Sequence, residues 1–182
     1  PGPPDVRFEQ LGGDLLAAVD LLGRTPGVDP DRVGVLGPSQ GASVAAGAAA
    51  ASDRIAFVIL TSVAGVTPAE QQRQEVRATM RAAGVSPGEI EDALAYLGLY
   101  FYVVRTGEAF DVLRSAWERA PDDSWARFVD MPRTIDDLRW WRDHHDFDTT
   151  SALAGTRVPT LAVWGSDDTI APPVPNAALV RD

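Results

Sequence analysis

Three short apolar runs, each rich in β-branched residues, constrain the fold more than any other feature of the sequence. They are Val33–Gly37, Ile55–Thr61 and Thr160–Gly165. Short apolar runs of this kind, bounded by turn residues, are typical of strands buried on both faces of a sheet. Segments with helical spacing accompany them, among them Phe8–Leu22 and the alanine-rich Gln40–Ala51. Strands that alternate with helices predict a parallel sheet of the α/β class.

A much longer segment, Pro68–Phe147, separates the second run from the third and has helical character throughout. A connection that returns the chain to a parallel sheet needs only about a dozen residues. This segment is about 80 residues long, so we interpret it as an inserted, all-helical cap. The predicted division is core residues 1–67, cap residues 68–147 and further core residues 148–182.

Four helices are predicted inside the cap from their start signals and periodicity. They run from Pro68 to about Ala83, onward from the capping sequence Ser86-Pro87-Gly88-Glu89, from Thr106 to Trp117 and over Ile135–Trp141. After the cap, Asp148 is predicted to cap a helix that leads back to the core.

The charge of the chain bears on its partners. All sixteen basic residues are arginine, and against twenty-six carboxylates they leave a net charge of −10. Because such a surface repels phosphate backbones and anionic lipids, we expect neither a nucleic acid nor a membrane as a partner. The chain has no cysteine, so disulfides and thiolate metal sites are excluded, and we expect no metal and no cofactor. We expect a cytoplasmic location, and the absence of a starting methionine predicts that the natural start of the chain precedes Pro1.

The pentapeptide Gly37-Pro38-Ser39-Gln40-Gly41 matches G-x-S-x-G and lies between a predicted strand and a predicted helix. In this motif a serine occupies a strained turn that exposes its hydroxyl, and the flanking glycines leave room for neighbouring backbone. We predict that Ser39 is a nucleophile and that the amide of Gln40, at the start of the helix, faces the position of an oxyanion. The alternatives are a glycine-rich turn with an exposed serine and a phosphate-binding turn.

With this motif in place, the chain resembles the α/β-hydrolases of the carboxylesterase and dipeptidyl/acylaminoacyl-peptidase types. The resemblance rests on the pentapeptide Gly37–Gly41, the nucleophile elbow of these enzymes, and on the last block, Val158–Pro173, and it extends over most of the chain. Further matching segments are Ala56–Ser62, Thr67–Gln71, Leu99–Phe101, Arg105–Glu108 and Trp140–Arg142. The resemblance implies an α/β-hydrolase fold, here with a partial sheet and a helical cap.

The resemblance also implies a catalytic acid after the third strand, in the pattern G-x-x-D. This pattern selects Asp168, with Asp167 as the alternative one residue earlier. A carboxylate there would orient a histidine base toward the nucleophile. The other interpretation of Asp168 is a turn residue that hydrogen-bonds to its own backbone.

The sequence contains only two histidines, His144 and His145, and both precede the acid. In the α/β-hydrolase order the histidine follows the acid. We therefore interpret this pair as solvated residues near a helix end, and we expect the catalytic histidine after Asp182 and the second oxyanion donor before Pro1.

Eleven of the fourteen aromatic residues lie within residues 68–147. Such a concentration in a cap suggests an apolar acyl or aryl pocket, whereas each ring taken singly is better explained as part of the core of the cap. The leading hypothesis is a serine hydrolase that cleaves a small ester through an acyl-enzyme. A serine exopeptidase acting on short peptides and a non-catalytic binding module remain as alternatives.

Overall fold

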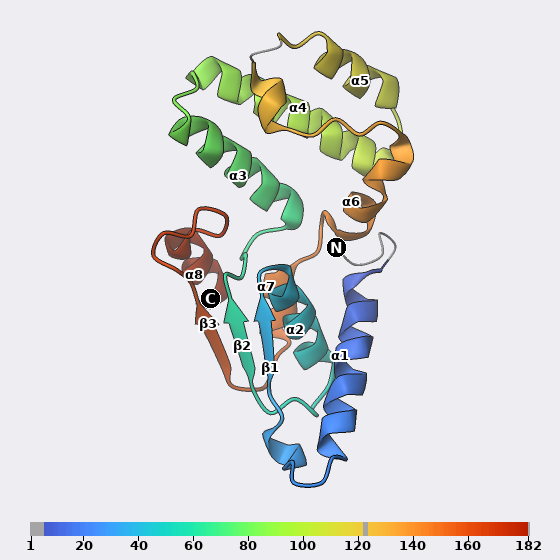
Figure 1. Ribbon diagram of the computed structural model, residues 1–182, viewed down its shortest axis with the longest axis vertical. Coiled ribbons are helices and arrows are strands. Elements are labelled where there is room, and N and C mark those ends of the chain that lie inside the picture. The colour runs from blue at the N-terminus through green and yellow to red at the C-terminus, as the bar shows by residue number, and fades with distance from the viewer. Residues whose placement is uncertain (1–5, 122–123, 182) are drawn as a thin grey trace. The chain divides into compact units, whose positions relative to one another are not determined.

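The computed structural model describes residues 6–121 and 124–181, which belong to two compact units (Figure 1). The core unit comprises Val6–Thr67 and the chain from Asp146 onward, and the helical unit comprises Pro68–His145. Each unit has its own group of buried apolar side chains.

The core unit contains a small parallel sheet in the order β1-β2-β3. Its strands are β1 (Val35–Pro38), β2 (Val58–Thr61) and β3 (Thr160–Val163). Its α-helices are α1 (Phe8–Gly23), α2 (Gln40–Ala51), α7 (Thr149–Ala154) and α8 (Pro173–Arg181). The predicted parallel arrangement is confirmed, but the described residues are mostly helical, and the full sheet of an α/β-hydrolase is not seen among them.

The strands are shorter than the apolar runs that predicted them. The second run begins at Ile55, whereas β2 begins at Val58. Ile55 is fully buried although it precedes the strand, because its side chain packs in the core of the unit. The apolar run therefore predicted the burial of Ile55 correctly, but only part of it pairs as a strand.

One face of the sheet is covered by α2. Val35, Val58 and Leu60 are buried on this face, and α2 packs on both β1 and β2. Alanines supply the buried surface of the helix, namely Ala42, Ala45, Ala46, Ala48 and Ala49. Because these side chains are small, the helix axis can approach the sheet closely.

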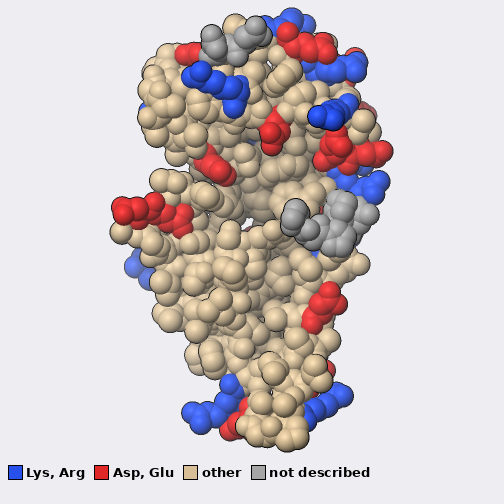
Figure 2. Space-filling view, in the orientation of Figure 1, with Lys and Arg blue, Asp and Glu red and all other residues tan. Residues whose placement is uncertain are grey.

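The opposite face of the sheet carries exposed apolar side chains. Leu36, Leu161 and Val163 alternate with the covered residues and are 63%, 56% and 44% exposed. Charged side chains are sparse over the core unit and more frequent over the helical unit on the face shown in Figure 2.

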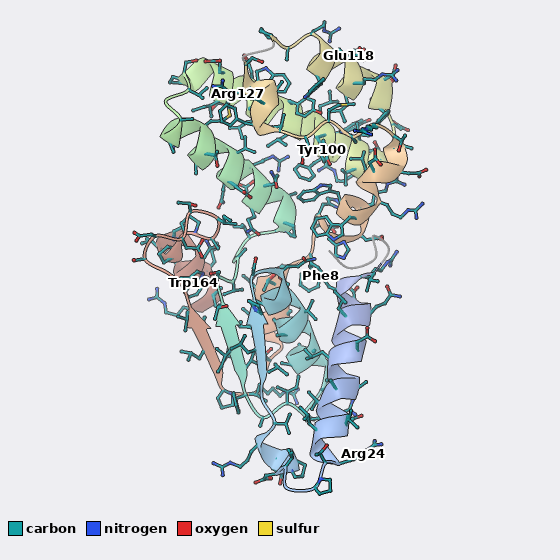
Figure 3. The ribbon with its side chains drawn as sticks, in the orientation of Figure 1. Phe8, Arg24, Tyr100, Glu118, Arg127 and Trp164 are labelled. Carbon is teal, nitrogen blue, oxygen red and sulfur yellow. The ribbon has the colours of Figure 1, made fainter. Side chains whose placement is uncertain are left out.

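The helical unit is built around one long helix. Its helices are α3 (Pro68–Ala82), α4 (Pro87–Thr106), α5 (Phe110–Glu118) and α6 (Arg139–His144), with 3-10 turns at Trp125–Phe128 and Ile135–Leu138. The predicted start of α4 is confirmed, since the Ser86 hydroxyl accepts the N–H of Glu89 at 3.4 Å. The α4 side chains Tyr96, Tyr100 and Phe101 are buried in the core of the unit, and Figure 3 labels Tyr100.

Two predictions for this segment are wrong. Thr106 does not begin a helix; it is the last residue of α4, and Gly107 closes that helix in a left-handed conformation (φ 74°). Residues 129–134 are not helical either. Pro132 lies in this stretch, and a proline has no amide hydrogen to donate to a preceding turn of helix.

Asp148 caps the start of α7, as predicted. Its carboxylate accepts the N–H of Ser151 at 3.0 Å and the hydroxyls of Ser151 and Thr150 at 2.6 and 2.7 Å. These hydrogen bonds, with that of the Ser151 hydroxyl the strongest cause, lower the pKa of Asp148 to about 2.

We expect Asp148→Ala to lower the free energy of unfolding by about 1 kcal/mol at pH 7, as the loss of a helix cap usually does. Because the pKa of the folded state lies below the unfolded value, the stabilisation is complete above about pH 4 and is lost as the pH falls toward 2. Urea unfolding of both proteins across this range measures the difference. Asp148→Asn, which keeps an acceptor, is the control; a gap between Asp148→Ala and the wild type that stays constant with pH would contradict the prediction.

Candidate active site

Ser39 occupies the sharp turn between β1 and α2. Its backbone dihedrals, φ 49° and ψ −122°, are rare for any residue with a side chain and cost on the order of 1–3 kcal/mol. Two hydrogen bonds hold the turn: the Ser39 N–H donates to Thr61 O, and the N–H of Ala42 donates to Ser39 O, both at 2.8 Å. The residue is exposed, and its hydroxyl does not cap α2. The hydroxyl is therefore free of the role that a serine usually has before a helix.

Gly37 permits this turn. A Cβ atom at Gly37 would lie 2.3 Å from Gly41 O and 2.9 Å from the Cα of Ala42. A Cβ atom at Gly41 would lie 3.2 Å from a ring carbon of Pro38. The close approach of the strand and the helix thus excludes a side chain at the first glycine of the motif and leaves little room at the second.

Gln40 is the first residue of α2. The first N–H groups of a helix have no acceptor within the helix, and the helix dipole is positive at this end. The backbone amide of Gln40, directly after Ser39, is therefore suited to donate to a negatively charged oxygen.

Asp168 lies in the turn that follows β3. Its Oδ1 accepts the N–H groups of Ala171 at 2.8 Å and Ile170 at 3.0 Å. The N–H of Ala171, then the hydroxyl of Ser62, then the N–H of Ile170 lower the pKa of the Asp168 carboxyl, which favours the ionised form. The turn interpretation of this residue therefore describes part of its environment. Asp167, the alternative acid, is exposed.

Parallel strands bring these residues to one edge of the sheet. Ser39 follows β1 and Asp168 follows β3, with β2 between the two strands. Strands in a sheet lie about 4.8 Å apart, so the carboxyl ends of β1 and β3 are roughly 10 Å apart. Ser62, the residue after β2, lies in the gap.

Three residues around this edge were not found from the sequence. Ser62 has a left-handed backbone (φ 53°), and its N–H donates to Val163 O at 2.8 Å. The indole Nε1 of Trp164, at the end of β3 (Figure 3), donates to Val63 O at 2.9 Å. Asn176 of α8 is 2% exposed. A polar side chain within the otherwise apolar run Pro172–Val180 was the available signal.

The interpretation of His144 and His145 as solvated is wrong. They are 0% and 8% exposed and belong to the helical unit, whereas Ser39 and Asp168 belong to the core unit. Their Nδ1 atoms lie 2.6 and 3.0 Å from the carbonyl oxygens of Trp140 and Trp141. Because a carbonyl only accepts, each Nδ1 carries the proton in these bonds. His144 also stacks on the ring of Trp140 at 4.7 Å, which accounts for its burial.

The described aromatic rings of the helical unit mostly pack on one another. The ring centroids of Tyr96 and Trp125 are 4.9 Å apart, and those of Phe101 and Trp141 are 5.1 Å apart. Burial raises the pKa of Tyr96 well above its usual value. These rings form the core of the helical unit, which agrees with the interpretation of the individual aromatic residues from the sequence. A substrate pocket in the cap stays a prediction.

In residues 6–121 and 124–181 no helix has the length and apolar character to cross a membrane. The same residues hold no cluster of three or more His, Cys, Asp or Glu side chains that could bind a metal ion.

Comparisons with solved structures find proteins that match most of the chain at low sequence identity and low TM-score. No protein-family model and no curated protein matches the chain. Acetyl xylan esterase 1 from Thermoanaerobacterium sp. JW/SL YS485 is 19% identical, with a TM-score of 0.46 over 95% of this chain. BpoC from Mycobacterium tuberculosis H37Rv, whose assignment as a non-heme bromoperoxidase is provisional, is 19% identical with a TM-score of 0.48 over 96%. Rv0554 from the same species is 20% identical with a TM-score of 0.47 over 95%.

The chain spans 42%, 61% and 59% of the lengths of these three proteins. Identities and TM-scores at this level assign neither a family nor an activity to the chain.

Proposed function

We propose that this chain carries the nucleophile and the acid of a serine hydrolase that cleaves carboxylic esters through an acyl-enzyme. The observation that carries the proposal is the strained backbone of Ser39, with φ 49° and an exposed side chain that does not cap the following helix. Strain of this kind persists where the surrounding structure holds it in place, and it is concentrated at functional sites. The close approach at Gly37 and the amide of Gln40 support the same assignment.

In the proposed reaction, Ser39 Oγ attacks the ester carbonyl and forms a tetrahedral intermediate. The N–H of Gln40 donates to its oxyanion, and one such donor contributes about 3 kcal/mol of transition-state stabilisation. A histidine base takes the proton of Ser39 and passes it to the departing alcohol as the ester C–O bond breaks. Water then attacks the acyl-serine by the same route and releases the acid.

Asp168 has the properties that the orienting group needs. Its hydrogen bonds favour the ionised form, and one carboxylate oxygen, Oδ2, accepts neither of the two backbone N–H groups that bind Oδ1. We propose that the histidine lies between Oδ2 and Ser39, in the gap of roughly 10 Å between the carboxyl ends of β1 and β3. We do not assign this histidine to one of residues 1–182, and the activity is tested on the complete natural protein.

A serine exopeptidase would use the same residues, because ester and amide cleavage share the acyl-enzyme. Turnover of p-nitrophenyl acetate and butyrate is to be compared with that of aminoacyl-p-nitroanilides on the complete natural protein. We expect larger kcat/KM values for the esters. A large advantage for the anilides would replace the esterase assignment with the exopeptidase.

A further inference from the structure

One buried side chain joins the two loops that surround Asp168. Asn176, in the first turns of α8, is 2% exposed. Its Oδ1 accepts the N–H of Gly65 at 2.8 Å, and its Nδ2 donates to Pro172 O at 2.8 Å. Gly65 belongs to the loop after β2, and Pro172 to the loop after β3. Both ends of the amide are used, and each binds a different loop.

The loop after β2 is also held tightly against its surroundings. A Cβ atom at Gly65 would lie 2.6 Å from the Cβ of Leu179 and 3.3 Å from Asn176 O, so the backbone of this loop lies directly on α8. On the other side, Trp164 Nε1 donates to Val63 O at 2.9 Å. Two side chains therefore fix the segment Val63–Gly65: Trp164, which precedes Asp168 in the chain, and Asn176, which follows it.

The two anchor points of Asn176 lie next to the groups that bind the Asp168 carboxylate. Pro172 directly follows Ala171, whose N–H donates to Asp168 Oδ1 at 2.8 Å. Gly65 lies three residues after Ser62 on the neighbouring loop, and the hydroxyl of Ser62 helps to lower the pKa of Asp168. A change in either anchor would move a group that holds the carboxylate.

We infer that Asn176 is a positioning residue for Asp168: it fixes the loops after β2 and β3 to each other, so that the carboxylate keeps one orientation at the edge of the sheet. Asn176 does not touch the reacting atoms and acts only through Ser62 and Ala171. The inference rests on the proposed function in treating Asp168 as the catalytic acid, whereas the coupling between the loops is independent of it.

The experiment follows the ionisation of Asp168 by carbon-13 NMR of its side-chain carboxyl, with the signal assigned by its loss in Asp168→Asn. In Asn176→Leu, which keeps the branched shape and removes both side-chain hydrogen bonds, we expect the Asp168 pKa to rise toward the ordinary value for an aspartate. Val174→Ala is the control, because Val174 is on the same helix and is 82% exposed. Asn176→Ser, whose side chain is too short to reach both loops, gives the same test if the leucine variant does not fold.

A second measurement separates positioning from a general structural role. Ser62→Ala is expected to raise the Asp168 pKa in the wild-type background and to change it little further in Asn176→Leu, because the two residues act through one arrangement. An unchanged Asp168 titration in a folded Asn176 variant would overturn the inference. So would equal effects of Ser62→Ala in both backgrounds.

In the complete natural protein, the same Asn176 variant is expected to slow labelling of Ser39 by a fluorophosphonate about 10- to 100-fold, the size of effect that a small misplacement of a catalytic group produces. The two readouts can fail separately. If the wild type is not labelled, the proposed function fails while the titration still tests the coupling. If labelling is normal and the titration does not respond to Asn176, only the positioning role fails.

Discussion

Replacing Ser39 with alanine is expected to abolish covalent labelling of the complete natural protein by a fluorophosphonate probe and to lower ester hydrolysis by about 10⁴-fold or more. The probe reacts only with an activated serine, and alanine has no hydroxyl oxygen to attack the phosphorus. Mass spectrometry of the labelled peptide, together with kcat/KM for p-nitrophenyl butyrate, measures both effects.

Ser43→Ala is the matched control for this experiment. Ser43 is on α2, about one turn after Ser39, and its hydroxyl is paired with that of Thr149 at 2.8 Å. This variant should therefore be labelled like the wild type. Labelling that persists in Ser39→Ala would place the nucleophile elsewhere. A wild-type protein that binds ester analogues but is never labelled would favour the non-catalytic binding module.

Gly37→Ala is expected to lower the free energy of unfolding by about 3 kcal/mol or more, at the upper end of what overpacking costs. The new Cβ would lie 2.3 Å from Gly41 O and 2.7 Å from Gly41 C. Both are backbone atoms of α2, so β1 and α2 would have to separate. Urea denaturation monitored by circular dichroism measures the loss.

Gly34→Ala provides a matched comparison with an equally short contact. Its Cβ would also lie 2.3 Å from the nearest atom, but that atom belongs to the ring of Phe57. Because Phe57 is 40% exposed, the ring can rotate outward, and we expect a cost below about 1 kcal/mol. Equal losses in the two variants would show that the collision with the backbone of α2 does not decide the stability of the turn.

The sequence was most informative where a local signal and a long-range requirement coincide. The helix after Ser39 was predicted with its observed bounds, Gln40–Ala51. A strained turn fixes its start, and an alanine-rich run carries it to its end in spite of Gly41 and Gly47. The parallel sheet followed from strands separated by helices, which leave no short connection for an antiparallel pair.

The sequence was less informative where tertiary contacts decide the outcome. His144 and His145 are polar residues at a helix end, so the sequence favours exposure. Their burial is explained by the carbonyl oxygens that accept their Nδ1–H groups and by the Trp140 ring on which His144 stacks. Asn176 has no motif, since its two partners lie 111 and 4 residues away in the chain. Thr106 is an ordinary helix-cap residue type, and the left-handed Gly107 after it decides that α4 ends there.

The hydrogen bond from the N–H of Ala69 to His145 O, 3.0 Å long, closes the helical unit on itself. Ala69 lies at the start of this unit and His145 at its end, so about 75 residues of chain leave and return at nearly one point. For protein engineering, we therefore expect that the unit can be removed or transferred at these two points. A linker of only a few residues could replace it, and the excised unit could be inserted into another host without stretching either chain.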